Sequence, residues 1–300
     1  MEFKQIEAFV NVVRYKSFTK AADATFFTQP TISTHISTLE KELGTKLLER
    51  RSRSVEMTPQ GRKFYRYAIE MVNTRAQAME AIGKDSTKVE GVLEIQTSTI
   101  PGIAFLPEVL SGFHEQYPGT QFYVDLSDSQ KVIENIVERR GEIGFVGDMA
   151  NSSNIESMPL FSDNVVLIAP KSYGISKSKI SMAEAVKFPF IWRESGSATR
   201  RSFEEAAVKL GYDKTAFEVV AKFNDIGQIV RAVEQGLGVS ILSEHAVEKF
   251  KSDDLVAVDI EGFDRKRTFY MITLENISHS PVAEAFRRYV TWYCDQAGKK

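Results

Sequence analysis

The hydrophobic pattern of the chain changes its period close to residue 90. In the first part, apolar residues such as Phe3, Ile6 and Phe9 recur at steps of three and four, which is typical of amphipathic helices. In the second part, short apolar runs such as residues 143–146 alternate with helical stretches, and this β-α-β order indicates an open, mostly parallel sheet. The polar segment 83–90 separates the two patterns. We therefore expect a helical N-terminal part, a linker and an α/β C-terminal part.

The chain has few of the residues that several functional classes require, and this scarcity argues against those classes. Its one cysteine, Cys294, cannot form an intrachain disulfide or a thiolate zinc site. The four histidines are far apart and lack metal-ligand spacing. No stretch approaches about 18 uncharged apolar residues, and the N-terminus lacks the apolar core of a signal peptide. We expect a cytoplasmic protein without a metal, a cofactor or a membrane association.

The third helix of the N-terminal part is the most informative one. Its buried stripe is formed by Ile32, Ile36, Leu39 and Leu43, at helical spacing. Thr28 is expected to cap it, as Thr19 is expected to cap the shorter second helix, and Gly44 is expected to end it. The opposite face is short, polar and mostly uncharged, and it consists of Gln29, Thr31, Ser33, Thr34, Ser37 and Thr38.

Such a face suits a recognition helix of a helix-turn-helix, which must enter the major groove of DNA. Gln29 can read adenine, and Ser33 and Thr34 can bond to bases or phosphates. The cluster of Arg50, Arg51 and Arg53 suits phosphates, and the short strand expected at residues 55–58 suits a β-wing. The alternative is a three-helix protein-interaction module with a solvated polar face.

The charge distribution favours the DNA-binding interpretation. The first 66 residues carry twelve Lys or Arg and seven Asp or Glu, a net charge of +5, whereas the rest of the chain carries −7. Such asymmetry is a hint of a DNA-binding end, although a solvated charged face gives similar counts.

A longer helix is expected at residues 59–82, after Pro59. Apolar residues follow a coiled-coil-like seam along it, which would pair the helix with its twin in a second copy. The alternative is that this stripe packs on its own domain. The seam consists of Tyr65, Ile69, Val72, Ala76 and Met79.

Hydroxyl side chains follow the expected strands of the C-terminal part. Because ligands of open α/β sheets bind at the carboxyl ends of strands, near helix N-termini, these side chains are candidates for holding a small anion. The alternative is that they are ordinary N-caps. Asp128, among them, would repel an anion if it faced the same cleft, and the ligand would then be neutral, cationic or paired with a base such as Arg200. The candidate effector-binding residues are Thr97, Ser98, Thr99, Ser127, Ser129, Ser197 and Thr199.

Five motifs lie within residues 3–61: Phe18-Thr19-Lys20-Ala21-Ala22, Thr28-Gln29-Pro30-Thr31-Ile32-Ser33, Leu39-Glu40-Lys41-Glu42-Leu43-Gly44, Leu47-Leu48-Glu49-Arg50 and Thr58-Pro59-Gln60-Gly61. Together they resemble the winged helix-turn-helix of LysR-type transcriptional regulators. The resemblance extends over nearly the whole chain, through Leu106-Pro107, Phe113, Tyr117-Pro118, Gly141-Glu142-Ile143 and Gly236-Leu237-Gly238-Val239. One departure is that Thr34 and His35 stand where the family usually has a basic residue followed by Gln, which puts the operator preference in doubt.

The resemblance implies an α+β multidomain chain. Residues 1–60 would form the winged helix-turn-helix, residues 61–90 a linker and dimerisation helix, and residues 91–300 a two-lobed effector domain similar to periplasmic binding proteins. Lobe I would comprise about residues 91–163 and 267–300, and lobe II about 164–266.

The implied function is a sequence-specific transcriptional regulator controlled by a small-molecule, anionic effector bound between the lobes. Its partners would be double-stranded DNA, the effector, other copies in a homodimer or homotetramer, and RNA polymerase as a further candidate. The DNA contacts would come from Thr28, Gln29, Pro30, Thr31, Ser33, Thr34, Arg50, Arg51 and Arg53.

An enzyme is the main alternative from another class. The Gly196-Ser197 pair resembles a nucleophile loop, but the chain has no GxSxG, no GxGxxG and no P-loop. We therefore expect no catalytic residues. A pure solute-binding protein would leave the N-terminal module unexplained.

Overall fold

The computed structural model describes residues 1–25, 27–50, 55–82, 89–150, 152–250, 252–264 and 266–297. The chain divides into two compact units. The N-terminal unit comprises Met1–Val89 with Ile277–Glu284, and the C-terminal unit comprises Glu90–Asn276 with Ala285–Lys300.

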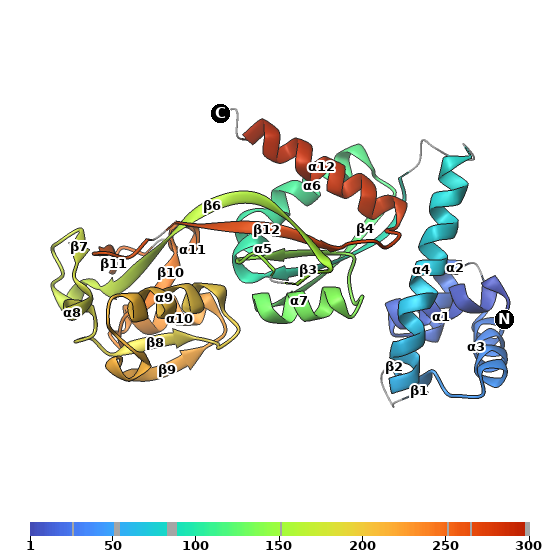
Figure 1. Ribbon diagram of the computed structural model, residues 1–300, viewed down its shortest axis with the longest axis horizontal. Coiled ribbons are helices and arrows are strands. Elements are labelled where there is room, and N and C mark those ends of the chain that lie inside the picture. Colours follow the sequence, from blue (N-terminus) through green and yellow to red (C-terminus); the bar gives the residue numbers. More distant parts are fainter. Residues whose placement is uncertain are drawn as a thin grey trace. The chain divides into compact units, whose positions relative to one another are not determined.

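The N-terminal unit is a small helical domain with a two-stranded wing (Figure 1). Ile32 and Leu39 of the third helix pack with Phe9 and Leu47 in one core, as the stripe predicts. Leu43, at the end of the stripe, is wrongly predicted to be buried, since it is exposed at the end of the helix. Strands β1 and β2 pair in antiparallel fashion, which confirms the expected short strand. The elements are α1 (Phe3–Tyr15), α2 (Phe18–Thr25), α3 (Gln29–Leu43), β1 (Leu48–Arg50), β2 (Val55–Met57) and α4 (Pro59–Ala81).

The ends of the helices follow local capping chemistry. The expected cap of α3 is confirmed, since the Thr28 hydroxyl accepts a hydrogen bond from the backbone N–H of Thr31 at 3.3 Å. Gly44 ends the helix with φ of 66°, a left-handed conformation that glycine adopts without strain. A cap at Thr19 is a wrong prediction from the sequence. Helix α2 begins at Phe18, and the Ser17 hydroxyl accepts from the N–H of Lys20 instead.

The apolar stripe of α4 divides between two environments. Tyr65 and Ile69 are buried in the core of their own unit, and Val72 packs against it. Met79 is 40% exposed. The interpretation that the stripe packs on its own domain therefore holds for the first half of α4, and only the later half remains available to another chain.

The C-terminal unit has two lobes (Figure 1). Lobe I is built on the parallel strands β4, β3 and β5, in that order, with β12 antiparallel beside β5. Ile95 and Phe145 are fully buried in it. Its elements are β3 (Gly91–Ser98), α5 (Thr99–Ala104), α6 (Leu106–Gln116), β4 (Thr120–Ser127), α7 (Ser129–Val137), β5 (Ile143–Val146) and α12 (Pro281–Ala297).

Lobe II combines a parallel pair, β8 and β9, with strands that pair with β6. The expected mostly parallel sheet is thus mixed, because β10 and β11 both run antiparallel to β6. Its elements are β7 (Lys179–Ile180), α8 (Met182–Ala185), β8 (Phe190–Arg193), α9 (Ala198–Lys209), β9 (Val219–Phe223), α10 (Ile226–Glu234), β10 (Ser240–Ser243), α11 (Glu244–Lys249) and β11 (Leu255–Ile260), with short 3-10 turns at Lys171–Tyr173 and Lys214–Ala216.

Two long strands lie side by side in Figure 1. β6 (Ile155–Pro170) runs through both lobes, and β12 (Lys266–Leu274) pairs with it from Lys266 onward into lobe I. β5 pairs with β12 from Tyr270 onward, and β10 pairs with β6 from Val165 onward. Between these points, and among the strands that the structure describes, residues 161–164 and 266–269 pair only with each other. We call these two short segments the neck. The cleft between the lobes lies next to it.

Candidate functional sites

The outer face of α3 presents polar groups whose hydrogen bonding is partly satisfied within the helix. The hydroxyls of Thr28 and Thr31 lie 2.8 Å apart, and the Thr34 hydroxyl donates to the carbonyl of Pro30 at 2.9 Å. The Gln29 amide has no hydrogen-bonding partner among the described residues, so both its donor and its acceptor are free for an external group. Ser33 is half-buried on the same helix.

The wing is fixed to α3 by a buried carboxylate that the sequence analysis did not single out. Glu40 is 7% exposed. Its Oε1 accepts from the backbone N–H groups of Leu47 and Leu48 at 2.9 and 3.2 Å, and its Oε2 pairs with Lys46 Nζ at 2.6 Å. The spacing of Glu40 within the apolar stripe is the signal that could have identified it. This carboxylate holds the start of β1 in place relative to α3.

Of the three arginines expected to contact DNA beside α3, the structure describes one. Arg50 is the last residue of β1 and pairs with Val55 of β2. Arg51 and Arg53 lie outside the described residues.

In the C-terminal unit, five of the expected hydroxyl residues come together in the cleft between the lobes. Ser98, Thr99 and Ser129 come from lobe I, and Ser197 and Thr199 come from lobe II. The cleft is narrow, with about 20 Å³ of free volume, close to what one water molecule requires. Thr97 and Ser127 do not line it.

Helix starts meet at this cleft, since α7 begins at Ser129 and α9 at Ala198. The Ser197 hydroxyl caps α9 by accepting from the N–H of Arg200. The Ser129 hydroxyl accepts from the N–H of Gly147 at 3.2 Å. The N-cap interpretation and the cleft interpretation therefore apply to the same residues. The partial positive charge of two helix N-termini favours negative charge in the cleft.

Asp128 lines the cleft and caps α7, because its Oδ1 accepts from the N–H of Lys131 at 2.9 Å. Its carboxylate lies directly against Gly196 of lobe II, where there is no room for a Cβ atom. The carboxylate is thus engaged with the start of α7 at the point where the lobes touch.

Two arginines in the cleft were missed from the sequence. Arg193 is 4% exposed, and its guanidinium pairs with Glu194 at 2.7 Å and donates to the Thr99 hydroxyl at 3.3 Å. Arg193 directly follows the apolar run 188–192. The expectation that ligands bind at the carboxyl ends of strands could therefore have identified it. Arg267 is the second residue of an antiparallel strand, so this expectation does not apply to it.

The guanidinium of Arg267 is buried and lies over the Phe269 ring, 4.4 Å from its centroid. Its Nε and Nη1 have no hydrogen-bonding partner within the described ranges. Desolvation lowers the pKa of Arg267 to about 10, against the raising effect of Asp163 and Asp148 and with a further lowering by Arg193. The group still carries its positive charge at neutral pH.

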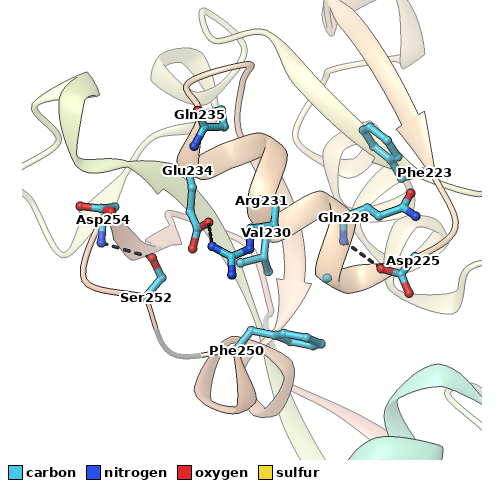
Figure 2. A pocket seen from close by; sticks show the side chains of 11 residues that line it. Phe223, Asp225, Gln228, Val230, Arg231, Glu234, Gln235, Phe250, Ser252 and Asp254 are labelled. Atoms are coloured by element: carbon cyan, nitrogen blue, oxygen red, sulfur yellow. Dashed lines mark hydrogen bonds and ion pairs between the residues drawn. The ribbon is translucent and has the colours of Figure 1, made fainter.

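A larger groove of about 760 Å³ lies on lobe II, between α10 and a segment that contributes Phe250, Ser252 and Asp254 (Figure 2). The guanidinium that lines it is already paired, Arg231 with Glu234 at 3.0 Å, and the carboxylates of Asp225 and Asp254 would repel an anion. We therefore place the candidate effector site in the smaller cleft, where buried donors remain free.

Arg200 and Cys294 can be set aside as functional groups. The Arg200 guanidinium pairs with Glu204 at 2.8 Å, on its own helix. Burial raises the pKa of the Cys294 thiol to about 11, so it stays protonated and weakly nucleophilic at neutral pH.

Comparison with known proteins shows the family. Residues 3–62 match the model of the bacterial regulatory helix-turn-helix protein, lysR family, and residues 86–294 match the LysR substrate binding domain. The chain belongs to the LysR family of transcriptional regulators. It is therefore a DNA-binding regulator with an effector-binding domain, and not an enzyme. Within the described ranges, no helix has the length and apolar character needed to cross a membrane.

Individual proteins agree with this assignment along the whole chain. The transcriptional activator CmpR of Synechocystis sp. is 30% identical over 95% of this chain and 93% of its own. A full-length OxyR variant from Pseudomonas aeruginosa shares the fold with a TM-score of 0.78 at 18% identity, over 97% and 94% of the two chains. The CcmR regulatory domain from Synechocystis PCC6803, in complex with 2-PG, aligns with a TM-score of 0.63 at 23% identity, over 68% of this chain and 98% of that one.

Proposed function

We propose that this LysR-family regulator reads its operator with the outer face of α3 and senses a small anionic metabolite in the cleft between its lobes. The observation that carries the proposal is the convergence of hydroxyls from three separate strand ends on one cleft with two arginines. The complex of the CcmR regulatory domain with 2-PG supports a small acidic molecule as the ligand class.

The proposed DNA contacts are Thr28, Gln29, Pro30, Thr31, Ser33 and Thr34 at the start of α3, together with Arg50, Arg51 and Arg53. The free amide of Gln29 supports base reading. The hydroxyls of Thr28 and Thr31 bond to each other, which leaves one of their two protons to donate to a phosphate. Thr34 donates to the helix backbone, so its proposed contact is the weakest of the set.

The proposed effector contacts are Ser98, Thr99, Ser129, Ser197 and Thr199. Thr97 and Ser127 would act through the strands that carry them, since neither lines the cleft. A ligand held by both lobes favours one arrangement over the other, which is the condition for a conformational signal.

The test is a gel-shift titration of the full chain on duplexes selected from a random-sequence pool, with and without each member of a panel of metabolite anions. We expect at least one anion to change the affinity for the selected duplex. The combined variant Thr99→Ala, Ser129→Ala should keep DNA binding and lose the response. A response that persists unchanged in this variant would exclude the cleft as the effector site.

We further propose that residues 61–90 link and dimerise the chain between the DNA-binding part, 1–60, and the effector part, 91–300. The exposed later half of the α4 stripe supports pairing with a second copy, as dimers or tetramers. Replacing Met79 with Glu should reduce the mass in light scattering, whereas the same change at exposed Tyr67 should not. We also propose that the regulator acts in the cytoplasm, with RNA polymerase as a further partner.

A further inference from the structure

Arg267 occupies the neck that joins the two lobes. Its backbone pairs with that of Asp163 across β12 and β6, and its side chain lines the cleft. The Nη1 atom lies close to Gly147 of lobe I, where an added Cβ would be 3.4 Å away. The guanidinium is therefore buried at the base of the cleft, where it can meet a ligand held by both lobes.

The acidic groups near Arg267 are all engaged elsewhere. The Asp163 carboxylate accepts from Ser243 Oγ and from the backbone N–H of Asn164, and it lies 2.7 Å from His245 Nδ1. Asp148 pairs with Arg201 at 3.2 Å.

The two carboxylates that line the cleft are likewise engaged, Glu194 with Arg193 and Asp128 with the start of α7. These carboxylates stabilise the positive charge of Arg267 by electrostatic attraction from a distance. None of them supplies a hydrogen-bond acceptor to its Nε or Nη1.

Other donors in the cleft are also unused. The hydroxyls of Ser98 on lobe I and Thr199 on lobe II have no hydrogen-bonding partner among the residues that the structure describes, although both residues are buried. An acceptor-rich group at this place would bond to both lobes and to the neck at once.

We propose that Arg267 anchors an oxyanion group of the effector, and that this ion pair is what makes closure of the lobes over the cleft favourable. A buried guanidinium without an acceptor is costly, and an oxyanion supplies both the countercharge and the acceptors. A neutral ligand would leave that cost in place, and a cation would increase it. The inference rests on the proposed function, because it names the ligand chemistry and the closing force of the same site.

Carboxylates, phosphoryl groups and sulfonyl groups share this chemistry, and the experiment separates them. The melting temperature of the full chain is measured in malonate, inorganic phosphate and sulfate, each at constant ionic strength set with chloride, and in glycerol as a neutral probe. We expect at least one oxyanion to raise the melting temperature in a saturable manner, and glycerol not to. The oxyanion with the lowest half-saturating concentration identifies which of these groups the effector carries.

The decisive variant is Arg267→Met, which keeps the length of the side chain and removes its charge. We expect it to melt no lower than the unaltered chain, and to need at least tenfold more oxyanion for half of the shift. Arg267→Lys, which keeps the charge, is the second variant if the methionine chain does not fold. It should retain a weakened shift. The matched control is Arg231→Gln, on the exposed surface of lobe II, which should respond as the unaltered chain does.

The outcomes separate this inference from the proposed function. If oxyanions stabilise Arg267→Met as well as the unaltered chain while Thr99→Ala, Ser129→Ala loses the effect, the cleft is the site and the role of Arg267 is wrong. If no oxyanion shifts the unaltered chain but a neutral metabolite changes DNA binding through the cleft, the inference is again wrong. The cleft then stands as the effector site, and the anionic class of the ligand in the proposed function is wrong. If the effect persists in both variants, both are wrong.

Discussion

The outer face of α3 and the cleft between the lobes are both polar, but they differ in what their side chains do for the fold. Gln29 on α3 is partly exposed and bonds to no described residue. In the cleft, Ser129 and Ser197 are buried and satisfy backbone N–H groups of the protein itself. Residues of the first surface can therefore change with the operator at little cost in stability. In the cleft, a change of ligand specificity is also a change in stability.

The largest expected effect separates the two faces of α3. Leu39→Ala should lower the free energy of unfolding of the N-terminal unit by about 2–5 kcal/mol, because Leu39 is fully buried and the cavity cannot close completely. Thr38→Ala, next to it on the exposed face, should change stability by less than about 0.5 kcal/mol. Urea unfolding followed by circular dichroism measures both. Equal losses would mean that the outer face is also part of the packing.

The second effect concerns DNA and not stability. Gln29→Ala should cost about 1–3 kcal/mol of binding free energy on the selected duplex and little on random DNA, because a bidentate base contact is lost. Its melting temperature should match that of the unaltered chain. Fluorescence anisotropy at fixed salt gives both affinities. Equal losses on the two DNAs would assign Gln29 to the backbone of the duplex.

The smallest effect tests the double role of the cleft residues. Ser197→Ala should lower stability by about 1 kcal/mol, since the cap of α9 is lost, and should weaken the effector response at the same time. Ser181→Ala, which removes the cap of α8 away from the cleft, is the matched control and should affect stability alone. If the response survives in Ser197→Ala, the residue is a cap and nothing more.

Local chemistry explains which parts of the structure could be predicted from the sequence. Thr28 and Gly44 mark the two ends of α3. Each acts through contacts with residues only a few positions away, so its role follows from residue type and spacing. The start of α2 was misplaced because Ser17 and Thr19 are both good caps, and the chain uses the earlier one. Thr97 was assigned to the cleft together with Ser98, yet successive side chains of a strand face opposite sides, and only Ser98 lines the cleft.

Residues whose place depends on distant pairing could not be predicted in this way. Arg267 reaches the cleft because β12 pairs with β6, where its partner is Asp163, and the whole of lobe II lies between these two residues in the sequence. Likewise, the stripe of α4 looks uniform in sequence. Its division into a buried and an exposed half depends on how far the core of the N-terminal unit, to which α1 contributes, extends along α4.

The neck has a consequence for how such a regulator can diversify. Asn164 pairs with Lys266, and paired residues of antiparallel strands have Cα atoms only about 5 Å apart. Lobe II is therefore an insertion whose two ends are adjacent, carried by lobe I as a cassette. Domain insertion is tolerated best where ends lie close together. Exchanging this segment between related chains at 164 and 266 would transfer Arg193, Ser197 and Thr199 as one block and leave Ser98, Thr99, Ser129 and Arg267 behind. Half of the recognition surface could thus be replaced in a single recombination step.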